Sequence, residues 1–280
     1  MRRMIRPIAI IGGTGVGELP FDEGTRAQGT IATPWGTASF VQGTIASTPV
    51  VFLPRHGEGH RTPPHRIAHH AHAAALAHLD VQAVLATAAV GGLRPDLGPG
   101  DLLVPDDLID LRPAAQPCTF FHEQVAHTDF THPYCPHVRR TLLQTSATLG
   151  ITPHSSGTYV CTAGPRYETP AEVRLFHQWG GAIVGMTGAP EAILCREAGL
   201  PYAAVALVTN SGAGWSAEPL SHDDVVRRMN QSLPRLRQWL CATIATLAEN
   251  PPDQPSVAAS IWDEPEAVAF GKPIVVMRRE

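Results

Sequence analysis

The chain has 280 residues, of which 44% are hydrophobic, and its formal net charge is -4 at pH 7. This length allows one large α/β domain or two smaller ones with a sizeable core. The weakly acidic balance gives no reason to expect a nucleic-acid partner, and no apolar run approaches the roughly 18 residues of a membrane span. The five cysteines are odd in number and form no CxxC pair, so we expect reduced thiols and a cytoplasmic location.

Short apolar runs alternate with helix-like segments in chain order. The first run follows a basic start, but with about five apolar residues it is too short for the core of a signal peptide. The predicted buried strands are 7–13, 48–54, 81–92, 101–110, 158–164, 181–188 and 202–210. The predicted helices are 65–79, 135–150, 170–181, 190–200 and 221–249. This alternation predicts an α/β fold with a mixed or largely parallel β-sheet flanked by helices.

The segment after residue 250 differs in composition, because it is rich in proline and acidic residues. We therefore expect a single domain at 1–250 and a C-terminal extension at 251–280. The composition leaves open whether this extension is ordered or loose.

Seven of the 14 histidines lie between positions 56 and 78. His69 and His72 could share a helical face, and His56 and His60 are four residues apart, which is one pattern of a metal site. No acidic partner stands at a known ligand spacing, however, and the sequence has no HExxH motif. We therefore predict no bound metal.

Residue types that bind ligands stand at the ends of the predicted strands. Open α/β sheets bind ligands at the carboxyl ends of their strands. The candidate positions are Gly12 to Gly15, Arg55 and His56, Thr87 to Gly92, Met186 and Thr187, and Thr209 and Asn210. Their coincidence with strand ends favours an enzyme.

Several of these positions favour an anionic ligand. The glycine turn lets backbone N–H groups converge, and Thr14 adds a hydroxyl donor. A dinucleotide fingerprint would need a third glycine, a following helix and an acidic residue for the ribose, which this segment lacks. Arg55 offers a planar fork for a tetrahedral oxyanion, His56 a further hydrogen bond, and Thr187 another hydroxyl. These groups predict phosphate, although a tight turn and a surface salt bridge would also explain the glycines and Arg55.

Five segments carry a more specific pattern. They read IIGGTG, LPRHGEGH, ATAAVGGLRPDLGPGDLLVPDDLID, GPRYETPAE and GMTGAPEAILCREAGLPYAAVALVTN. With them the chain resembles the purine nucleoside phosphorylase and methylthioadenosine phosphorylase family, from about residue 7 to about 245. The resemblance implies the nucleoside phosphorylase fold, with a central mixed β-sheet, in one phosphorylase domain that assembles as a homotrimer. It also implies cleavage of a purine nucleoside by inorganic phosphate to free base and ribose 1-phosphate, with phosphate as a co-substrate and no cofactor.

The resemblance assigns roles to individual positions. The residues that it places on phosphate are Thr14, Arg55, His56, Thr187 and, through its backbone, Ala89. The residues that it places around the base are Tyr167, Glu168, Asn210, Val90 and Gly91. Met186 corresponds to the methionine that packs on the ribose, and Arg55, His56 and Asn210 are the expected catalytic residues. The chain departs from the methylthioadenosine branch at Ala88, where a threonine is usual, and at 210–212, where that branch carries aspartates.

Glu168 and Asn210 suit the edge of a 6-oxopurine. Such a base presents an acceptor at O6 and a donor at N1–H, whereas adenine presents a donor at N6 and an acceptor at N1. A carboxylate only accepts, so Glu168 suits N1–H, while the amide of Asn210 can donate to O6 and accept from N7–H. This pairing resembles the branch specific for hypoxanthine and guanine. A cap for the helix near Pro170 is a plainer role for Glu168.

The sugar end leaves several functions open. By the resemblance His222 would bind a 5′-hydroxyl, where the methylthio branches carry an apolar residue, although a surface or capping role is equally open to a lone histidine. His60 is a second candidate near the sugar. The leading hypothesis is phosphorolysis of inosine and guanosine. The alternatives are phosphorolysis of methylthioinosine or of methylthioadenosine, a nucleosidase that uses water, and a non-catalytic purine-binding protein.

Overall fold

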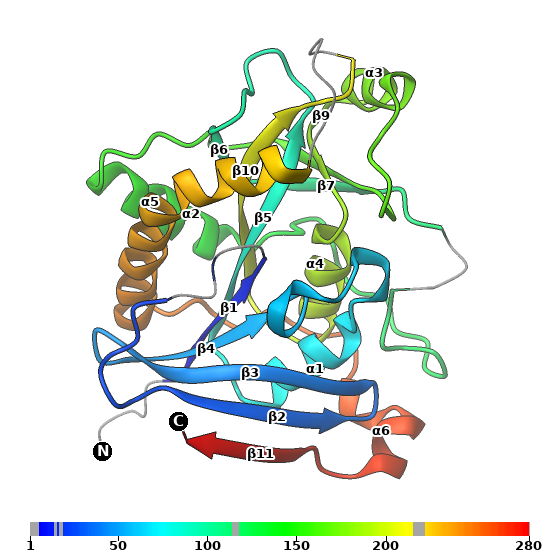
Figure 1. Ribbon diagram of the computed structural model, residues 1–280. Coiled ribbons are helices and arrows are strands. Elements are labelled where there is room, and N and C mark those ends of the chain that lie inside the picture. Colours follow the sequence, from blue (N-terminus) through cyan, green and yellow to red (C-terminus); the bar gives the residue numbers. More distant parts are fainter. Residues whose placement is uncertain (1–5, 14–15, 17–18, 114–117, 215–221, 280) are drawn as a thin grey trace.

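The computed structural model describes residues 6–13, 16, 19–113, 118–214 and 222–279, without the side chains at 222–226, 228, 229 and 279. A mixed sheet of eleven strands forms the centre of this part of the chain (Figure 1). The strands are β1 (Ile8–Gly12), β2 (Ala27–Thr33), β3 (Gly36–Ile45), β4 (Thr48–Pro54), β5 (Ala83–Gly92), β6 (Leu102–Leu103), β7 (Asp107–Asp110), β8 (Thr158–Cys161), β9 (Gly181–Gly185), β10 (Tyr202–Ser211) and β11 (Ile274–Arg279). The α-helices are α1 (His69–His78), α2 (Pro136–Thr148), α3 (Pro170–Gln178), α4 (Gly188–Glu197), α5 (His222–Glu249) and α6 (Pro265–Phe270), with 3-10 turns at Glu58–His60, Pro64–Arg66 and Ile261–Asp263.

The strand order is β11-β2-β3-β4-β1-β5-β9-β8-β7, and β10 pairs with β5 and with β6. Strands β4, β1, β5 and β10 are parallel neighbours, and so are β7, β8 and β9. The other pairings are antiparallel. The predicted α/β fold with a mixed sheet flanked by helices is therefore confirmed. Because β4, β1, β5 and β10 are parallel, their carboxyl ends meet at one edge of the sheet.

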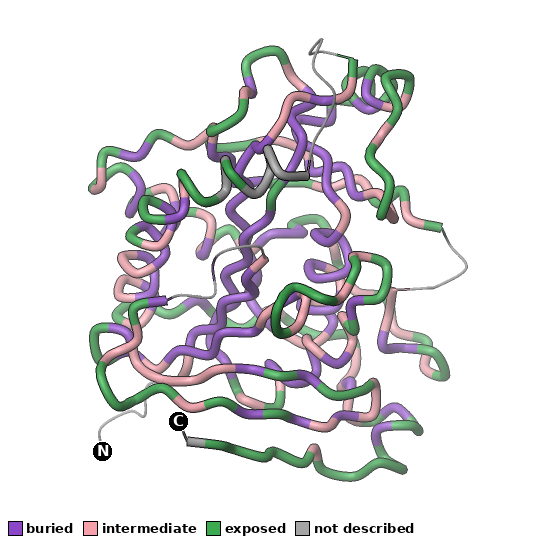
Figure 2. Tube along the Cα trace, viewed as in Figure 1, coloured by how far each residue is buried: buried purple, intermediate pink, exposed green. Residues whose placement is uncertain are grey.

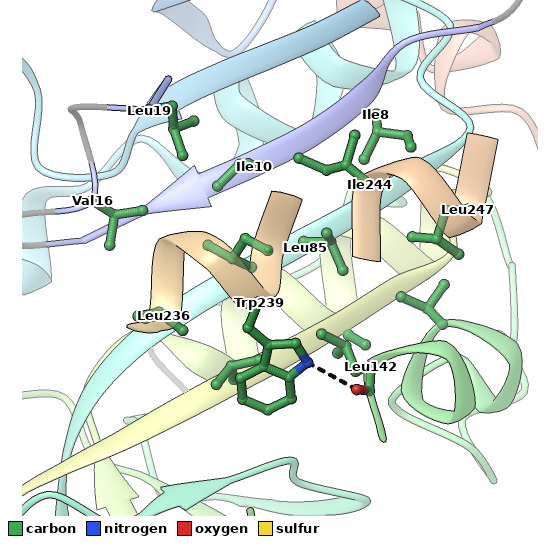
Figure 3. Close-up of a cluster of buried hydrophobic side chains, with 14 of the residues drawn as sticks. Ile8, Ile10, Val16, Leu19, Leu85, Leu142, Leu236, Trp239, Ile244 and Leu247 are labelled. Carbon is green, nitrogen blue, oxygen red and sulfur yellow. Dashed lines mark hydrogen bonds between the residues drawn. The ribbon is translucent and has the colours of Figure 1, made fainter. Parts of the chain in front are cut away.

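The side chains of β1 alternate between two helical layers, as the geometry of a strand requires. Ile8 and Ile10 lie in a cluster with α5 and α2, centred on the buried Trp239 (Figure 3). The indole N–H of Trp239 donates to a backbone carbonyl of α2 at 2.8 Å. Ala9 and Ile11 lie in a second cluster, with residues of α1 and α4. Both faces of the central strands are therefore buried, which Figure 2 shows as a purple centre.

The structure corrects three details of the predicted elements. The segment at 101–110 forms two strands, because Pro105 lies between β6 and β7 and has no N–H for a ladder. Strand β6 pairs antiparallel with β10, whereas β7 pairs parallel with β8. Helix α1 begins at His69 rather than at 65, after the 3-10 turn at Pro64–Arg66. The hairpin of β2 and β3 was not predicted, because its exposed face carries a polar and irregular pattern.

The C-terminal segment after residue 250 is ordered against the rest of the chain. Strand β11 pairs antiparallel with β2 and forms the edge of the sheet (Figure 1, red). Ile261 is buried beside Phe120. The indole N–H of Trp35 donates to the carboxylate of Glu266 on α6.

Candidate active site

The strand ends bring the candidate residues to one edge of the sheet. Strand β1 ends at Gly12, and Arg55 and His56 follow β4 directly. The backbone N–H of Arg55 donates to the carbonyl of Gly12 at 3.0 Å, which ties these two strand ends together. The polar positions at the ends of β5 and β10 lie on the two strands that pair beyond β1.

Arg55 is buried, with 3% of its surface exposed. Its guanidinium forms a bidentate ion pair with the carboxylate of Glu191, through Nε to Oε1 and through Nη2 to Oε2 at 2.9 Å. Nη1 donates to the carbonyl of Thr87 at 2.7 Å. Burial alone would lower the pKa of Arg55, but the charge of Glu191 and its hydrogen bonds raise the pKa above the usual range. Arg55 is therefore a fixed cation and not a surface salt bridge.

The partners of Arg55 were not predicted from the sequence. Glu191 lies in the first turn of α4, where it is 3% exposed, and the hydroxyl of Tyr202 donates to its Oε2 at 3.1 Å. Burial raises the pKa of Tyr202 well above its ordinary value, so this hydroxyl stays protonated. The one signal in the sequence was an acidic residue inside the otherwise apolar helix GAPEAILC.

Gly13, directly after β1, lies against Arg55. A Cβ atom at Gly13 would lie 2.9 Å from Nη1 of Arg55, so only glycine permits this close approach. Thr14 is outside the described residues, and its contact with phosphate stays a prediction. Ala89 is the exposed position of the otherwise buried strand β5, so its backbone is accessible from the site.

His56 is neutral at pH 7. Burial, together with the positive charges of Arg55 and His60, lowers its pKa to about 4, although its hydrogen bond to Thr62 has the opposite effect. The carbonyl of Thr62 lies 2.8 Å from Nδ1 and can only accept, so Nδ1 carries the proton. Nε2 of this tautomer is an acceptor. Nε2 can therefore accept a hydrogen bond from a protonated phosphate oxygen, but it could donate one to phosphate only after taking up a proton.

Thr187 and Met186 stand at the end of β9. Thr187 is 7% exposed and is the N-cap residue of α4, but its side chain makes no capping hydrogen bond. The backbone N–H groups and the dipole of this helix start favour an anion. Met186 is half-buried and packs against Gly164, which belongs to the loop that carries Glu168. We call Arg55, His56 and Thr187 with their surroundings the phosphate half of the candidate site, and Tyr167, Glu168 and Asn210 with theirs the base half.

Glu168 is half-buried on the loop before α3. Its Oε1 accepts a hydrogen bond from the hydroxyl of Thr162 at 2.9 Å, and burial raises its pKa above the ordinary value. The cap of α3 is made by other residues: the Thr169 side chain accepts from the backbone N–H of Glu172, and the Glu172 carboxylate accepts from that of Thr169. A carboxylate that is held in place without capping the helix is available to a ligand.

Asn210 lies beside Gly91 across the pairing of β10 with β5. A Cβ atom at Gly91 would lie 3.1 Å from Nδ2 of Asn210, so glycine gives the amide room. The hydroxyl of Thr209 lies 3.0 Å from Oδ1 of Asn210, and Nδ2 donates to the carbonyl of Ser211 at 3.1 Å. These contacts orient the amide and leave it one more donor and one more acceptor position. Val90, the residue before Gly91, is buried.

The segment after β10 touches the start of α3. A Cβ atom at Gly214 would lie 2.8 Å from Cβ of Pro170, and one at Gly212 would lie 2.7 Å from the side chain of Val173. The Asn210 segment and the Glu168 loop are therefore neighbours. Tyr167, on the same loop, is 39% exposed, as a residue that lines an open pocket would be.

A cavity of about 640 Å³ opens beside the glycine turn, between β2, β3, β11 and α5. His56 and His60 form one wall, with their ring centroids 4.1 Å apart. Val276 and Arg278 of β11 form another wall, so the C-terminal extension borders this cavity, whose lining includes Gly13 and His56 but not Glu168 or Asn210. His222 begins α5, but its side chain is outside the description, and its predicted contact with the 5′-hydroxyl stays a prediction.

Within the described part of the chain, no group of three or more His, Cys, Asp or Glu residues could hold a metal ion, although His69 and His72 lie with their rings 6.5 Å apart. Among the helices described there, none combines the length and the apolar character that a membrane crossing needs.

A profile described as the phosphorylase superfamily matches residues 7–245. The chain belongs to this superfamily. It is 43% identical over 245 residues to a 6-oxopurine nucleoside phosphorylase of Pyrococcus furiosus, with 85% of this chain and 91% of that protein covered. It is 41% identical over 241 residues to a probable S-methyl-5′-thioinosine phosphorylase of Methanothermobacter thermautotrophicus, covering 86% and 84%.

Solved structures of the superfamily agree with the fold. A methylthioadenosine phosphorylase from an antarctic soil metagenomic library superposes with a TM-score of 0.83 at 33% identity, covering 90% of each chain. The methylthioadenosine phosphorylase of Schistosoma mansoni, solved in complex with adenine, gives a TM-score of 0.82 at 30% identity, covering 87% of this chain and 92% of that one.

Proposed function

We propose that this phosphorylase cleaves 6-oxopurine nucleosides, such as inosine and guanosine, with inorganic phosphate to give the free base and ribose 1-phosphate. The observation that carries the proposal is the hydrogen bonding of Glu168. Its carboxylate accepts a hydrogen bond from Thr162, while Thr169 and Glu172 make the cap of helix α3. An ionised carboxylate accepts from N1–H of a 6-oxopurine and repels the lone pair at N1 of adenine. The 43% identical relative named as a 6-oxopurine nucleoside phosphorylase supports the same substrate class.

The chemistry divides between the two halves of the site. Breaking the glycosidic bond develops positive charge on the ribosyl ring and negative charge on the departing purine. Phosphate, held by Arg55, Thr14, Thr187 and the backbone of Ala89, stabilises the cation and attacks the anomeric carbon. Asn210 donates to O6 of the departing purine, so its contribution grows toward the transition state, and it accepts from N7–H once N7 has taken up a proton that replaces the one given up by hydrogen phosphate. No covalent intermediate with a side chain is needed.

His56 contributes to the phosphate site in a defined protonation state. Because its pKa is lowered to about 4 and Nδ1–H is bound to Thr62, its Nε2 is an acceptor. We propose that His56 accepts a hydrogen bond from the protonated oxygen of bound hydrogen phosphate. We also propose that inorganic phosphate is the one co-substrate and that the reaction uses no metal or organic cofactor.

The direct test measures base release from inosine with and without phosphate. We expect hypoxanthine and ribose 1-phosphate in equal amounts, and no release in phosphate-free buffer. Equal rates in both buffers would overturn the proposal in favour of a hydrolase. Adenosine serves as the matched control substrate, since it differs at the purine edge alone.

Phosphorolysis of methylthioinosine is a second candidate, favoured by the 41% identical relative that carries that name. Its base contacts would be the same, and only the 5′ pocket would differ. A histidine at 222 can bind a 5′-hydroxyl, so we expect inosine to be preferred and His222→Met to shift the preference toward methylthioinosine by about 10- to 100-fold. A wild type that prefers methylthioinosine, with no response to the substitution, would decide for the second candidate.

We also propose a cytoplasmic homotrimer, on the resemblance to the family. Within the described segment 118–133, Phe120 and Phe121 are buried within the chain, whereas Val125 is 92% exposed. Light scattering at working concentration tests the assembly, and a monomer would contradict it.

A further inference from the structure

The guanidinium of Arg55 is held on one side by Glu191, and Glu191 is held in turn by Tyr202. Both charged side chains of the pair are 3% exposed, and the two hydrogen bonds between them run in parallel. Such a fork-to-fork pair fixes the plane of the guanidinium as well as its position. The hydroxyl of Tyr202, 3.1 Å from Oε2, adds a third contact to the same carboxylate.

The remaining hydrogen-bonding capacity of Arg55 lies near the glycine turn. Glu191 contacts Nε and Nη2, and the carbonyl of Thr87 uses one N–H of Nη1. Each terminal nitrogen of a guanidinium carries a further N–H group. Nη1, which Glu191 does not contact, is the atom that lies against Gly13. The ion pair with Glu191 therefore leaves Nη1 of Arg55 beside Gly13, where phosphate is proposed to bind.

We propose that Glu191 and Tyr202 are positioning residues for phosphate, which act through Arg55 without touching the substrate. The inference rests on the proposed function for the identity of the anion. Glu191 carries a negative charge close to the phosphate site, so charge alone would make its removal tighten phosphate binding. The geometry predicts weaker phosphate binding instead, because a guanidinium released from the carboxylate of Glu191 loses its fixed plane. Tyr202→Phe separates the two effects, since it leaves the charge of Glu191 in place.

The neighbouring residue Tyr134 supplies a matched control. Its ring stacks on that of Tyr202, with centroids 5.9 Å apart and planes inclined by 28°, and both residues are buried. The hydroxyl of Tyr134 has no hydrogen-bond partner in the part of the chain that the structure describes. Tyr134→Phe therefore removes the same atom from the same layer of the core without disturbing Glu191.

The experiment measures initial rates at saturating inosine while phosphate is varied. We expect Tyr202→Phe to raise KM for phosphate by about 3- to 10-fold, the size of one lost hydrogen bond. KM for inosine at saturating phosphate and the preference for inosine over adenosine should stay within about twofold. Tyr134→Phe should change neither constant. An unchanged KM for phosphate in Tyr202→Phe, or an equal rise in Tyr134→Phe, would overturn the inference.

A second readout is independent of turnover. Phosphate raises the melting temperature of a protein that binds it, by an amount set by its concentration and Kd. We expect a clear phosphate-dependent shift in the wild type, a smaller one in Tyr202→Phe, and a smaller one again in Glu191→Asp, which keeps the charge but retracts the carboxylate. Equal shifts in wild type and Tyr202→Phe would refute the positioning role alone. A wild type that shows no shift and releases base without phosphate would refute the proposed function itself.

Discussion

In the phosphate half of the site, Arg55 is 3% exposed, and groups of α4 and β5 bind three of its nitrogen atoms. In the base half, by contrast, Glu168 is half-buried on a loop, and its carboxylate accepts a hydrogen bond from the hydroxyl of Thr162. The first arrangement belongs to the core, since its residues come from strand ends and from a helix packed on the sheet. The second is assembled at the start of α3, outside the central strands. A substitution in the phosphate half should therefore disturb folding as well as function.

We expect the base half to change with little effect on the fold, because Glu168 lies on a loop outside the central strands.

The largest expected effect is on the stability of the phosphate half. Arg55→Met leaves the buried carboxylate of Glu191 without its cation, and breaking such a pair costs about 3–5 kcal/mol of unfolding free energy. The double variant Arg55→Met, Glu191→Leu replaces both partners, so it should recover most of the lost unfolding free energy but not the phosphate-dependent activity. Urea denaturation measures the first quantity and base release the second. A loss below about 1 kcal/mol in the single variant would show that the pair is not an integral part of the core.

In the base half the largest effect should be on the rate rather than on stability. Asn210→Ala removes a donor to the departing purine, which should raise the barrier by about 3 kcal/mol and lower kcat/KM for inosine by roughly 100-fold. Its unfolding free energy should change by less than about 1 kcal/mol. Asn250→Ala, at an exposed amide beyond α5, is the control. If Asn210→Ala lowered the unfolding free energy but left kcat/KM for inosine unchanged, the expected difference between the two halves would be contradicted.

The helix cap beside Glu168 should have an intermediate effect. Thr169→Ala removes the side chain that accepts from the N–H of Glu172, and caps of this kind contribute about 1 kcal/mol to stability. Because the same loop carries Glu168, KM for inosine should rise severalfold while KM for phosphate stays constant. Steady-state kinetics with each substrate varied in turn provide the measurement. An equal rise in both constants would mean that the two halves are not separable.

The effect that is smallest near neutral pH concerns histidine protonation, because it develops only as the pH falls. Burial lowers the pKa of His72 to about 4, with the charges of Arg55 and His56 acting in the same direction. The unfolded chain takes up this proton near pH 6.5, so the contribution to stability is complete above about pH 6.5 and is lost as the pH falls toward 4. His72→Gln should therefore flatten the fall in melting temperature across that interval. His65→Gln, at an exposed position, should leave the slope unchanged, and an equal response of both variants would contradict the assignment.

Much of the fold was accessible from the sequence because its central strands are buried on both faces. Apolar runs, several of them ending in glycine, predicted β1, β4, β5, β9 and β10, and the candidate residues Arg55, Thr187 and Asn210 stand at or just beyond the ends of three of these strands. Strands β2 and β3 escaped because one face of their hairpin is exposed. The extension after residue 250 could not be placed, because strand β11 depends on a partner more than two hundred residues away in sequence.

The sequence offered candidate site residues where local motifs carry them, but not the partners that meet these residues from distant parts of the chain. Glu191 is 136 positions from Arg55, so no spacing rule could join them. Glu168 and Thr169 are adjacent at a helix start, and only side-chain geometry shows that Thr169 is the cap. His56 was expected to donate a hydrogen bond, but its neutral state depends on burial and on Thr62, which a sequence does not reveal.

The measurement that tests the central claim most directly is kcat/KM for inosine and for adenosine, at saturating phosphate, in the wild type and in Glu168→Gln. A site that hydrogen-bonds the edge of its substrate can discriminate by about four orders of magnitude, so the wild type should show little turnover of adenosine. Glu168→Gln can donate to N1 of adenine as well as accept, and should narrow the ratio by at least about tenfold, mainly by losing inosine activity. Equal use of the two nucleosides by the wild type would contradict the role of Glu168 and with it the assignment of the protein to 6-oxopurines.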